Sequence, residues 1–299
     1  MNRKTMVEKT VKYVLTVCAV IAVAAVFSIT VYMFLKGTTA FREIGIRELL
    51  FGTKWAPTAE EPSYGILYII LSSAVGTGAA VLIGVPIGLL TAVFFSEMAK
   101  GPMGGVVRSA VELLAAIPSV IYGLVGMMVL NPWMYRLEKA IYANDPTHRF
   151  TGGANLLAAV IVLAIMILPT VISVSTSSLK AVSVQLRQAS LALGATKMQT
   201  IFKVVIPAAK SGILTGVVLG IGRALGEAMA INMVAGGAVN IPLPFHSVRT
   251  LTTQIVSEMG YAQGLHRQVL FTVGLVLYIF IMIVNFILLW VRKKEADRR

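Results

Sequence analysis

Charged side chains are scarce in this chain of 299 residues. Asp, Glu, Lys and Arg make up 13% of it, whereas about 25% is usual for a soluble domain. Hydrophobic residues make up 57%, and the mean hydropathy is +0.82. This composition excludes an ordinary soluble globular protein and predicts a polytopic membrane protein whose helices face lipid and one another.

Side chains that carry enzymatic or metal chemistry are also few. The only cysteine, Cys18, lies in an apolar run, so neither an intramolecular disulfide nor a thiolate metal site is possible. The chain has no Gly-x-x-x-x-Gly-Lys-Ser/Thr, no His-Glu-x-x-His and no Gly-x-Ser-x-Gly. Its three histidines are far apart, at His148, His246 and His266. We therefore predict no catalytic residue, metal or cofactor, and any ATP must be hydrolysed by another chain.

The net charge of +13 could indicate nucleic acid or anionic lipid as a partner. The basic residues, however, cluster at the ends of the apolar segments, where membrane topology explains them. No nucleic-acid partner is predicted.

Six apolar segments reach the roughly 20 residues that a helix needs to cross a bilayer. The first is too long for the apolar core of a cleaved signal peptide and is interpreted as a retained span. Pro86, Pro118 and Pro169 lie inside the second, third and fourth segments, where neighbouring helices tolerate kinks. The predicted spans are Val11–Leu35, Gly65–Phe95, Arg108–Leu130, Asn155–Ser178, Ser211–Val234 and Val269–Val291.

Lys and Arg residues predict the orientation of these spans. With a cytoplasmic N-terminus, sixteen of the 26 lie on the cytoplasmic side and nine outside, and Arg223 lies in the membrane. Both termini are therefore predicted to be cytoplasmic, as residues 1–10 and a basic tail at 292–299.

The fifth span carries two charges in the stretch GVVLGIGRALGEAMA, residues 216–230. On one continuous helix, Gly216, Gly220, Arg223 and Glu227 would share a face. The glycines would let a neighbouring helix approach closely. An ionised residue at the bilayer centre costs roughly 2.5–3.5 kcal/mol, so a polar pathway or a protein contact is expected. The alternative is an intrahelical ion pair between Arg223 and Glu227.

Two other carboxylates receive simpler interpretations. Glu112 follows Arg108 by four residues at the start of the third span and is predicted to form an interfacial ion pair with it. Glu258 lies in an outer loop and is predicted to be a solvated charge, with a contact to a partner or gate as the alternative.

The loop from Lys180 to Lys210 carries five basic residues and no acidic one. Its pattern predicts two short helical pieces, hinged near Gly194 and stopped at Pro207. A structured loop of this kind docks a partner, or else it lies on anionic lipid as an amphipathic segment.

Within this loop, RQASLALGAT and the later VVIP resemble the EAA motif of ABC importer permeases. Gln188 takes the position of the motif's Glu, followed by Ala189 and Ser190, then Gly194 and Pro207 at the expected spacing. The resemblance implies a coupling helix that begins near Arg187 and docks in a cleft of the ATPase subunit. Glu to Gln and Ala to Ser are departures from the motif.

Three further stretches are similar to permeases of the phosphate-specific importer: Phe51–Ile66, Glu112–Leu124 and Gly222–Gly237. The first and third look most like its PstC-type subunit. The resemblance implies an all-α membrane protein with the type I ABC importer (MetI-like) fold. It also implies a permease core over 65–291, containing the coupling loop 180–210, and an extra N-terminal helix over 11–35.

The same resemblance implies a function. Arg223 would face the path and offer a bidentate fork to inorganic phosphate, with Glu227 holding it when the path is empty. Implied partners are a PstA-type permease, two ATPase subunits, a periplasmic or lipid-anchored phosphate-binding protein, the lipid bilayer, and a phosphate-regulatory protein with a sensor kinase. Two alternatives stay open: another oxyanion such as sulfate or molybdate, or a membrane scaffold that senses phosphate without transporting it.

Overall fold

The structure is a computed structural model that describes residues 3–99 and 102–296. Within these residues, five helical segments are long and apolar enough to cross a membrane, and a bent pair of helices makes a sixth. Every predicted span overlaps one of them. The segments are Glu8–Glu43, Leu67–Met98, Leu156–Lys180, Lys197–Gly226 and Gly264–Trp290, and the bent pair is Ser109–Ala116 with Ser119–Ile141.

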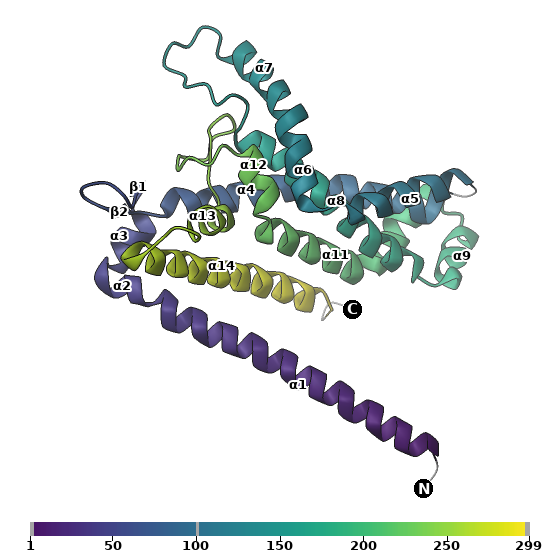
Figure 1. The fold of residues 1–299 in the computed structure, drawn as a ribbon. Coiled ribbons are helices and arrows are strands. Elements are labelled where there is room, and N and C mark those ends of the chain that lie inside the picture. The colour runs from purple at the N-terminus through teal and green to yellow at the C-terminus, as the bar shows by residue number, and fades with distance from the viewer. Residues whose placement is uncertain (1–2, 100–101, 297–299) are drawn as a thin grey trace.

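The spans contain most of the helices labelled in Figure 1. Three of them include a π-helical turn, written η. The helices of all the spans, in chain order, are α1 (Arg3–Gly37), α4 (Leu67–Val93) with η1 (Phe94–Met98), α5 (Pro102–Ala116), α6 (Ser119–Val125) with η2 (Gly126–Leu130) and α7 (Asn131–Ile141), α8 (Leu156–Lys180), α10 (Lys197–Thr200) with η3 (Ile201–Val205) and α11 (Ile206–Gly226), and α14 (Gly264–Ala296).

Short elements fill the connections. One β-hairpin pairs Trp55 with Tyr64 and is the exception to an otherwise helical fold in the described residues. The connecting elements are α2 (Thr39–Glu43), α3 (Ile46–Phe51), β1 (Trp55–Ala56), β2 (Ser63–Tyr64), α9 (Val184–Ala192), α12 (Met229–Val234) and α13 (Leu251–Glu258).

Helix α8 is the centre of the helix bundle. In its most apolar stretch 61% of the residues are buried, more than in any other span described, and it packs against both α4 and α11. Small residues allow this approach: a Cβ on Gly84 of α4 would lie 2.7 Å from Ile167 Cδ1. A Cβ on Gly88 would lie 2.9 Å from Val171 Cγ1. The three helices therefore pack at glycine-width separation, as small residues permit in membranes.

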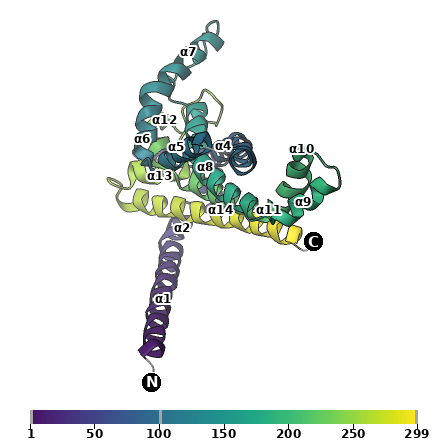
Figure 2. The same ribbon diagram turned by 90° about the vertical axis from the view of Figure 1, so that its right-hand side faces the viewer.

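Helix α1 stands apart from this bundle. Figures 1 and 2 both show it extending away from the other helices, and none of its most apolar stretch is buried. The C-terminal end of α1 meets α14, where Tyr32 packs edge-on against Phe271 and Phe34 packs edge-on against Tyr278. The apolar stretch of α1 that α14 leaves uncovered must be covered by lipid or another chain.

The third span breaks at Pro118, where a kink was predicted. The helices on either side are bent by 96°, more than a proline kink alone, so the span is two helices and not one. Pro118 has an extended ψ of 142°, and the Tyr122 hydroxyl donates to the Leu114 carbonyl at 2.7 Å. Pro86 and Pro169, in contrast, lie inside α4 and α8 without ending them.

The fifth span differs from its prediction. It was expected as one helix over Ser211–Val234, but α11 ends at Gly226 and α12 starts at Met229. Glu227 between them has an extended backbone, with φ −72° and ψ 126°. Its carbonyl accepts a hydrogen bond from Thr252 Oγ1 at 2.8 Å, which satisfies the group that the break exposes.

The ends of the chain are described in part. The backbone of the predicted basic tail continues α14 as far as Ala296, and residues 297–299 lie outside the described residues. The predicted ion pair of Glu112 with Arg108 depends on the Arg108 side chain, which is also outside them.

Candidate functional site

Arg223 lies in the last turn of α11, where a positive charge interacts favourably with the helix dipole. Its guanidinium is partly buried and reaches Thr170 Oγ1 of α8 at 3.5 Å, a long hydrogen bond. It forms no ion pair with a carboxylate in the described part of the chain. The guanidinium therefore has donors to spare.

Glu227 lies beyond the end of α11, so it does not share a helical face with Arg223 as predicted. Its Oε1 accepts the Ala230 backbone N–H at 3.0 Å and caps the start of α12. The ion pair suggested by the i, i+4 spacing is not formed, because the backbone turns away between the two residues. Arg223 lies just before the helix break and contacts Thr170, whereas Glu227 lies in the break and contacts Ala230.

Gly216 and Gly220 lie on the side of α11 that meets α8. A Cβ on Gly216 would lie 3.2 Å from Val174 Cβ, and one on Gly220 would lie 3.0 Å from Val171 Cγ2. Both distances are tighter than ordinary contacts. The glycines hold Arg223 close to α8 and its hydroxyl groups.

The predicted coupling loop is structured. Helix α9 is capped by Ser183, and the chain then turns at Gly194 with φ +84°, a conformation that favours glycine. A capping box of Thr196 and Gln199 starts α10. Two helical pieces hinged at Gly194 are therefore found as predicted.

Pro207 does not stop the second helical piece, which corrects the prediction. Helix α10 continues through η3 into α11, and Pro207 lies in the first turn of α11. The π-helical turn at Ile201–Val205 directly precedes it and changes the backbone register where a proline ring would clash with the preceding turn. The segment Lys197–Gly226 is thus one unbroken helical rod of 30 residues.

Arg187 anchors α9 from the inside. It forms an ion pair with Glu97 of η1 and donates to the Leu179 carbonyl at 2.6 Å. Ser190 and Thr200 share a hydroxyl hydrogen bond of 2.9 Å between α9 and α10. The partner Glu97 is a residue that the sequence reasoning missed, because ninety positions separate it from Arg187.

The segment from α9 to η3 exposes large apolar side chains at its surface. No residue of α9 is buried, and Gln188 and Ala189 of the motif are exposed. Leu193 is 89% exposed at the tip beside Gly194, and other large apolar side chains of the same segment are also exposed: Val184, Leu186, Leu191, Met198 and Phe202. A rigid, exposed apolar surface of this kind is typical of a docking site.

Glu258 was predicted to be solvated, and this is wrong. It is 5% exposed, at the end of α13. Trp55 Nε1 donates to both of its oxygens at 3.2 and 3.1 Å, and His266 Nε2 lies 2.7 Å from Oε2. Arg249 completes the set with an ion pair. We call Trp55, Arg249, Glu258 and His266 the outer carboxylate cluster.

A second buried carboxylate organises the loop after α7. Glu138 is fully buried, accepts the Thr151 backbone N–H and hydroxyl at 2.9 Å each, and meets His148 Nε2 at 2.9 Å. The His148 ring stacks on Tyr142 at 3.8 Å. Glu138 and Glu258 therefore each fix a connection between helices. The described residues include no group of three or more His, Cys, Asp or Glu that could hold a metal.

Broken membrane spans beside a partly buried charge, with a structured loop that exposes apolar side chains, are features expected of a transporter permease. The family described as "binding-protein-dependent transport system inner membrane component" matches residues 84–296, and the chain belongs to this family. Two solved structures share the fold. A bacterial alginate ABC transporter matches with a TM-score of 0.64 and 16% identity, over 95% of this chain and 94% of that one. The MetNI methionine transporter matches with 0.57 and 22%, over 77% and 95%.

Sequence relatives narrow the class and confirm the predicted resemblance to PstC-type permeases. The phosphate transport system permease protein PstC of Pasteurella multocida is 33% identical over 263 residues, 83% of this chain and 82% of that protein. PstC of Haemophilus influenzae is 32% identical, over 85% and 86%. A probable ABC transporter permease of Bacillus subtilis, YqgH, is 38% identical, over 92% and 89%.

Proposed function

We propose that this chain is the PstC-type subunit of an ATP-driven importer that moves inorganic phosphate across the bacterial inner membrane. The observation that carries the proposal is Arg223. Its described partner is a single hydroxyl at 3.5 Å, although an ionised residue near the bilayer centre costs roughly 2.5–3.5 kcal/mol. A passing oxyanion supplies the missing counter-charge, and a guanidinium stays charged throughout and binds phosphate oxygens in pairs.

The proposed partners follow from the similarity to PstC. A binding protein delivers phosphate to the outer face, a PstA-type permease encloses the path together with this chain, and two ATPase subunits close on ATP. A phosphate-regulatory protein and a sensor kinase are further partners. Both termini are cytoplasmic in this arrangement. ATP acts by binding the closed ATPase dimer more tightly, and the permeases follow that population shift.

The coupling loop 180–210 continues into the membrane as helix, and this scheme needs such a connection. Helix α9 and Leu193, which follows it, offer exposed apolar side chains to the ATPase, and Gly194 joins them to the rod Lys197–Gly226. A rod of 30 residues is about 45 Å long and ends three residues after Arg223. A push on the docking surface therefore reaches the charged break through one rigid element.

Glu227 has a supporting role in the proposal. It places a negative charge at the same break and fixes the start of α12. To hold Arg223 when the path is empty, Glu227 must first release the Ala230 N–H whose hydrogen bond it accepts in the structure.

The test is uptake of labelled phosphate by proteoliposomes that contain the complete importer. Arg223→Gln is expected to abolish uptake while the subunits still assemble and the ATPase still binds ATP. Wild-type uptake by Arg223→Gln would contradict the pathway role.

The same vesicles decide between cargoes. We expect excess unlabelled phosphate to compete, and sulfate and molybdate to leave uptake unchanged. Competition by sulfate or molybdate alone would assign another oxyanion. A wild-type complex that hydrolyses ATP and moves no anion would favour the sensing scaffold.

A further inference from the structure

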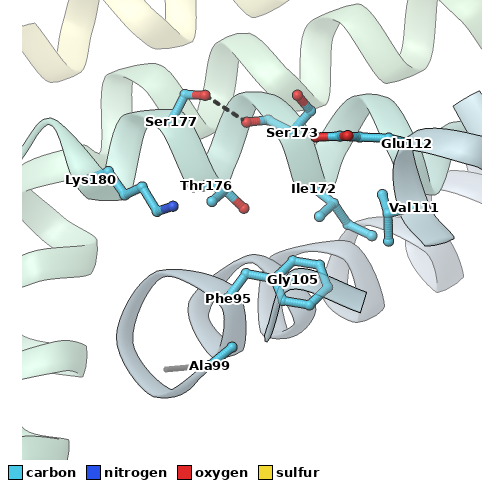
Figure 3. A pocket seen from close by; sticks show the side chains of 10 residues that line it. All are labelled: Phe95, Ala99, Gly105, Val111, Glu112, Ile172, Ser173, Thr176, Ser177 and Lys180. Atoms are coloured by element: carbon cyan, nitrogen blue, oxygen red, sulfur yellow. Dashed lines mark hydrogen bonds between the residues drawn. The ribbon is translucent and has the colours of Figure 1, made fainter. Parts of the chain in front are cut away.

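A pocket of about 290 Å³ lies between η1, the start of α5 and the last turns of α8. Figure 3 shows Thr176 and Lys180 pointing from α8 toward Phe95 and Ala99, and Glu112 reaching from α5 toward Ser173. Lys180 ends α8, and the coupling segment follows directly. The pocket therefore opens at the coupling end of the membrane body.

The polar residues of α8 are confined to the half of the helix that forms this pocket. From Leu156 to Pro169 every side chain is apolar, whereas Thr170–Lys180 contains six hydroxyl groups and one lysine. The change occurs at Thr170, the residue that Arg223 contacts. Ten residues separate Thr170 from Lys180, about 15 Å, which is half of a hydrocarbon core of roughly 30 Å.

Hydroxyl groups in membrane helices often bond their own backbone, and part of this set does so. Ser177 donates to the Ser173 carbonyl at 3.0 Å, and Ser178 donates to the Val174 carbonyl at 2.7 Å. Two hydroxyl groups of the set, Ser175 Oγ and Thr176 Oγ1, are buried without a hydrogen-bond partner, and of these two residues Thr176 lines the pocket. A buried hydroxyl without a partner is uncommon and needs an explanation.

We infer that Thr170, Ser173 and Thr176, which we call the inner hydroxyl face, form the exit half of the anion path and lead from Arg223 to Lys180. This inference rests on the proposed function. Neutral hydroxyl donors suit an exit, because conduction requires sites that bind weakly and in succession. Lys180 adds a mobile positive charge at the mouth, and Glu112 on the opposite wall adds a negative charge that keeps the anion from staying.

The first experiment measures turnover in the complete importer reconstituted in proteoliposomes. Thr176→Val and Ser173→Ala are each expected to lower maximal phosphate uptake roughly fivefold, the effect of one hydrogen bond. Half-saturation by the loaded binding protein and ATP hydrolysis should not change, so more ATP is used per phosphate. The matched control is Ser178→Ala on the same helix, whose hydroxyl faces Gly212 of α11, and its uptake should stay at the wild-type level.

The second experiment does not depend on turnover. Cys18 is the only cysteine of this chain, so Cys18→Ser leaves the chain without a thiol, and labelling is read on this subunit after the importer's subunits are separated. In that background, Thr176→Cys should react with an anionic, membrane-impermeant thiol reagent applied from the cytoplasmic side. Millimolar inorganic phosphate should slow the reaction, and Ser178→Cys should stay unreactive.

The outcomes separate the two proposals. If the wild type moves no phosphate, the proposed function fails. If the wild type moves phosphate and Arg223→Gln does not, but Thr176→Val and Ser173→Ala both transport at the wild-type rate, the inner hydroxyl face is overturned. Equal labelling of Thr176→Cys with and without phosphate would overturn it as well.

Discussion

Two sets of charged residues interrupt the apolar body of this chain, and they differ in how completely they are partnered. In the outer carboxylate cluster, Glu258 receives hydrogen bonds or an ion pair from Trp55, Arg249 and His266. At the break of the fifth span, Arg223 reaches one hydroxyl at 3.5 Å. A saturated charge fixes architecture, whereas a charge with free donors is available to a ligand.

The elements that each set connects support this division. The outer carboxylate cluster joins the β1–β2 hairpin, the loop before α13, α13 itself and the start of α14. Arg249 also donates to the Gly237 carbonyl at 2.7 Å and to Gln254 Oε1 at 3.1 Å. Arg223 joins α11 and α8, which already meet through their glycines. Removing a charge should therefore destabilise the fold at the outer carboxylate cluster, whereas at Arg223 it should abolish transport.

The largest expected effect is on the stability of the outer carboxylate cluster. Glu258→Ala leaves Arg249 without its ion-pair partner and should lower the free energy of unfolding by about 3–5 kcal/mol. Unfolding of the purified chain in detergent micelles, followed by circular dichroism, measures it. Glu61→Ala, at an exposed residue between β1 and β2, should change stability by less than about 0.5 kcal/mol. Equal stability of the two variants would contradict the structural role.

A smaller loss should follow from removing one donor of the cluster. Trp55→Phe keeps a ring that packs edge-on against Tyr64 but removes the indole N–H that meets both Glu258 oxygens. Hydrogen bonds to charged groups contribute about 1.5–3 kcal/mol, which is the expected loss in the same unfolding assay. Trp133→Phe, at a tryptophan that is 67% exposed on α7, is the control. A loss at Trp133 as large as that at Trp55 would point to ring size as the cause.

Most of the fold could be predicted from the sequence, because a run of about 20 apolar residues has few places to go other than a bilayer. The approximate positions of the six spans, a break in the helix at Pro118 and the hinge at Gly194 follow from local chemistry, whereas the 96° size of the bend at Pro118 does not. The coupling segment was also predictable, since its glycine and its helix caps act within a few residues.

The misassigned residues depend on contacts between distant parts of the chain. Glu258 is buried by Trp55, 203 positions away, so its place in a loop gave no sign of burial. The break at Glu227 is stabilised by Thr252, 25 positions later. Pro207 ends no helix because η3 changes the backbone register before it, and no residue type marks such a turn.

Glu227 tests how much the helix break beside Arg223 contributes to stability. Glu227→Ala removes the side-chain cap of α12 and should cost about 1 kcal/mol in the unfolding assay. Glu227→Gln keeps a side-chain oxygen at the same position and should stay within about 0.5 kcal/mol of the wild type. Phosphate uptake by Glu227→Gln then isolates the role of the negative charge. If Gln destabilises as much as Ala, the charge and not the cap stabilises α12.

The smallest effect on stability is expected where the effect on transport is largest. Arg223→Gln loses one long hydrogen bond to Thr170 and removes a charge from the membrane, and these two changes oppose each other. Its free energy of unfolding should stay within about 0.5 kcal/mol of the wild type, or rise, while uptake is lost. Arg223→Lys keeps the charge without the planar fork, so it should match that stability and recover at most part of the uptake. If Arg223→Gln were as unstable as Glu258→Ala, Arg223 would belong to the architecture, and its loss of uptake would say nothing about the path of the anion.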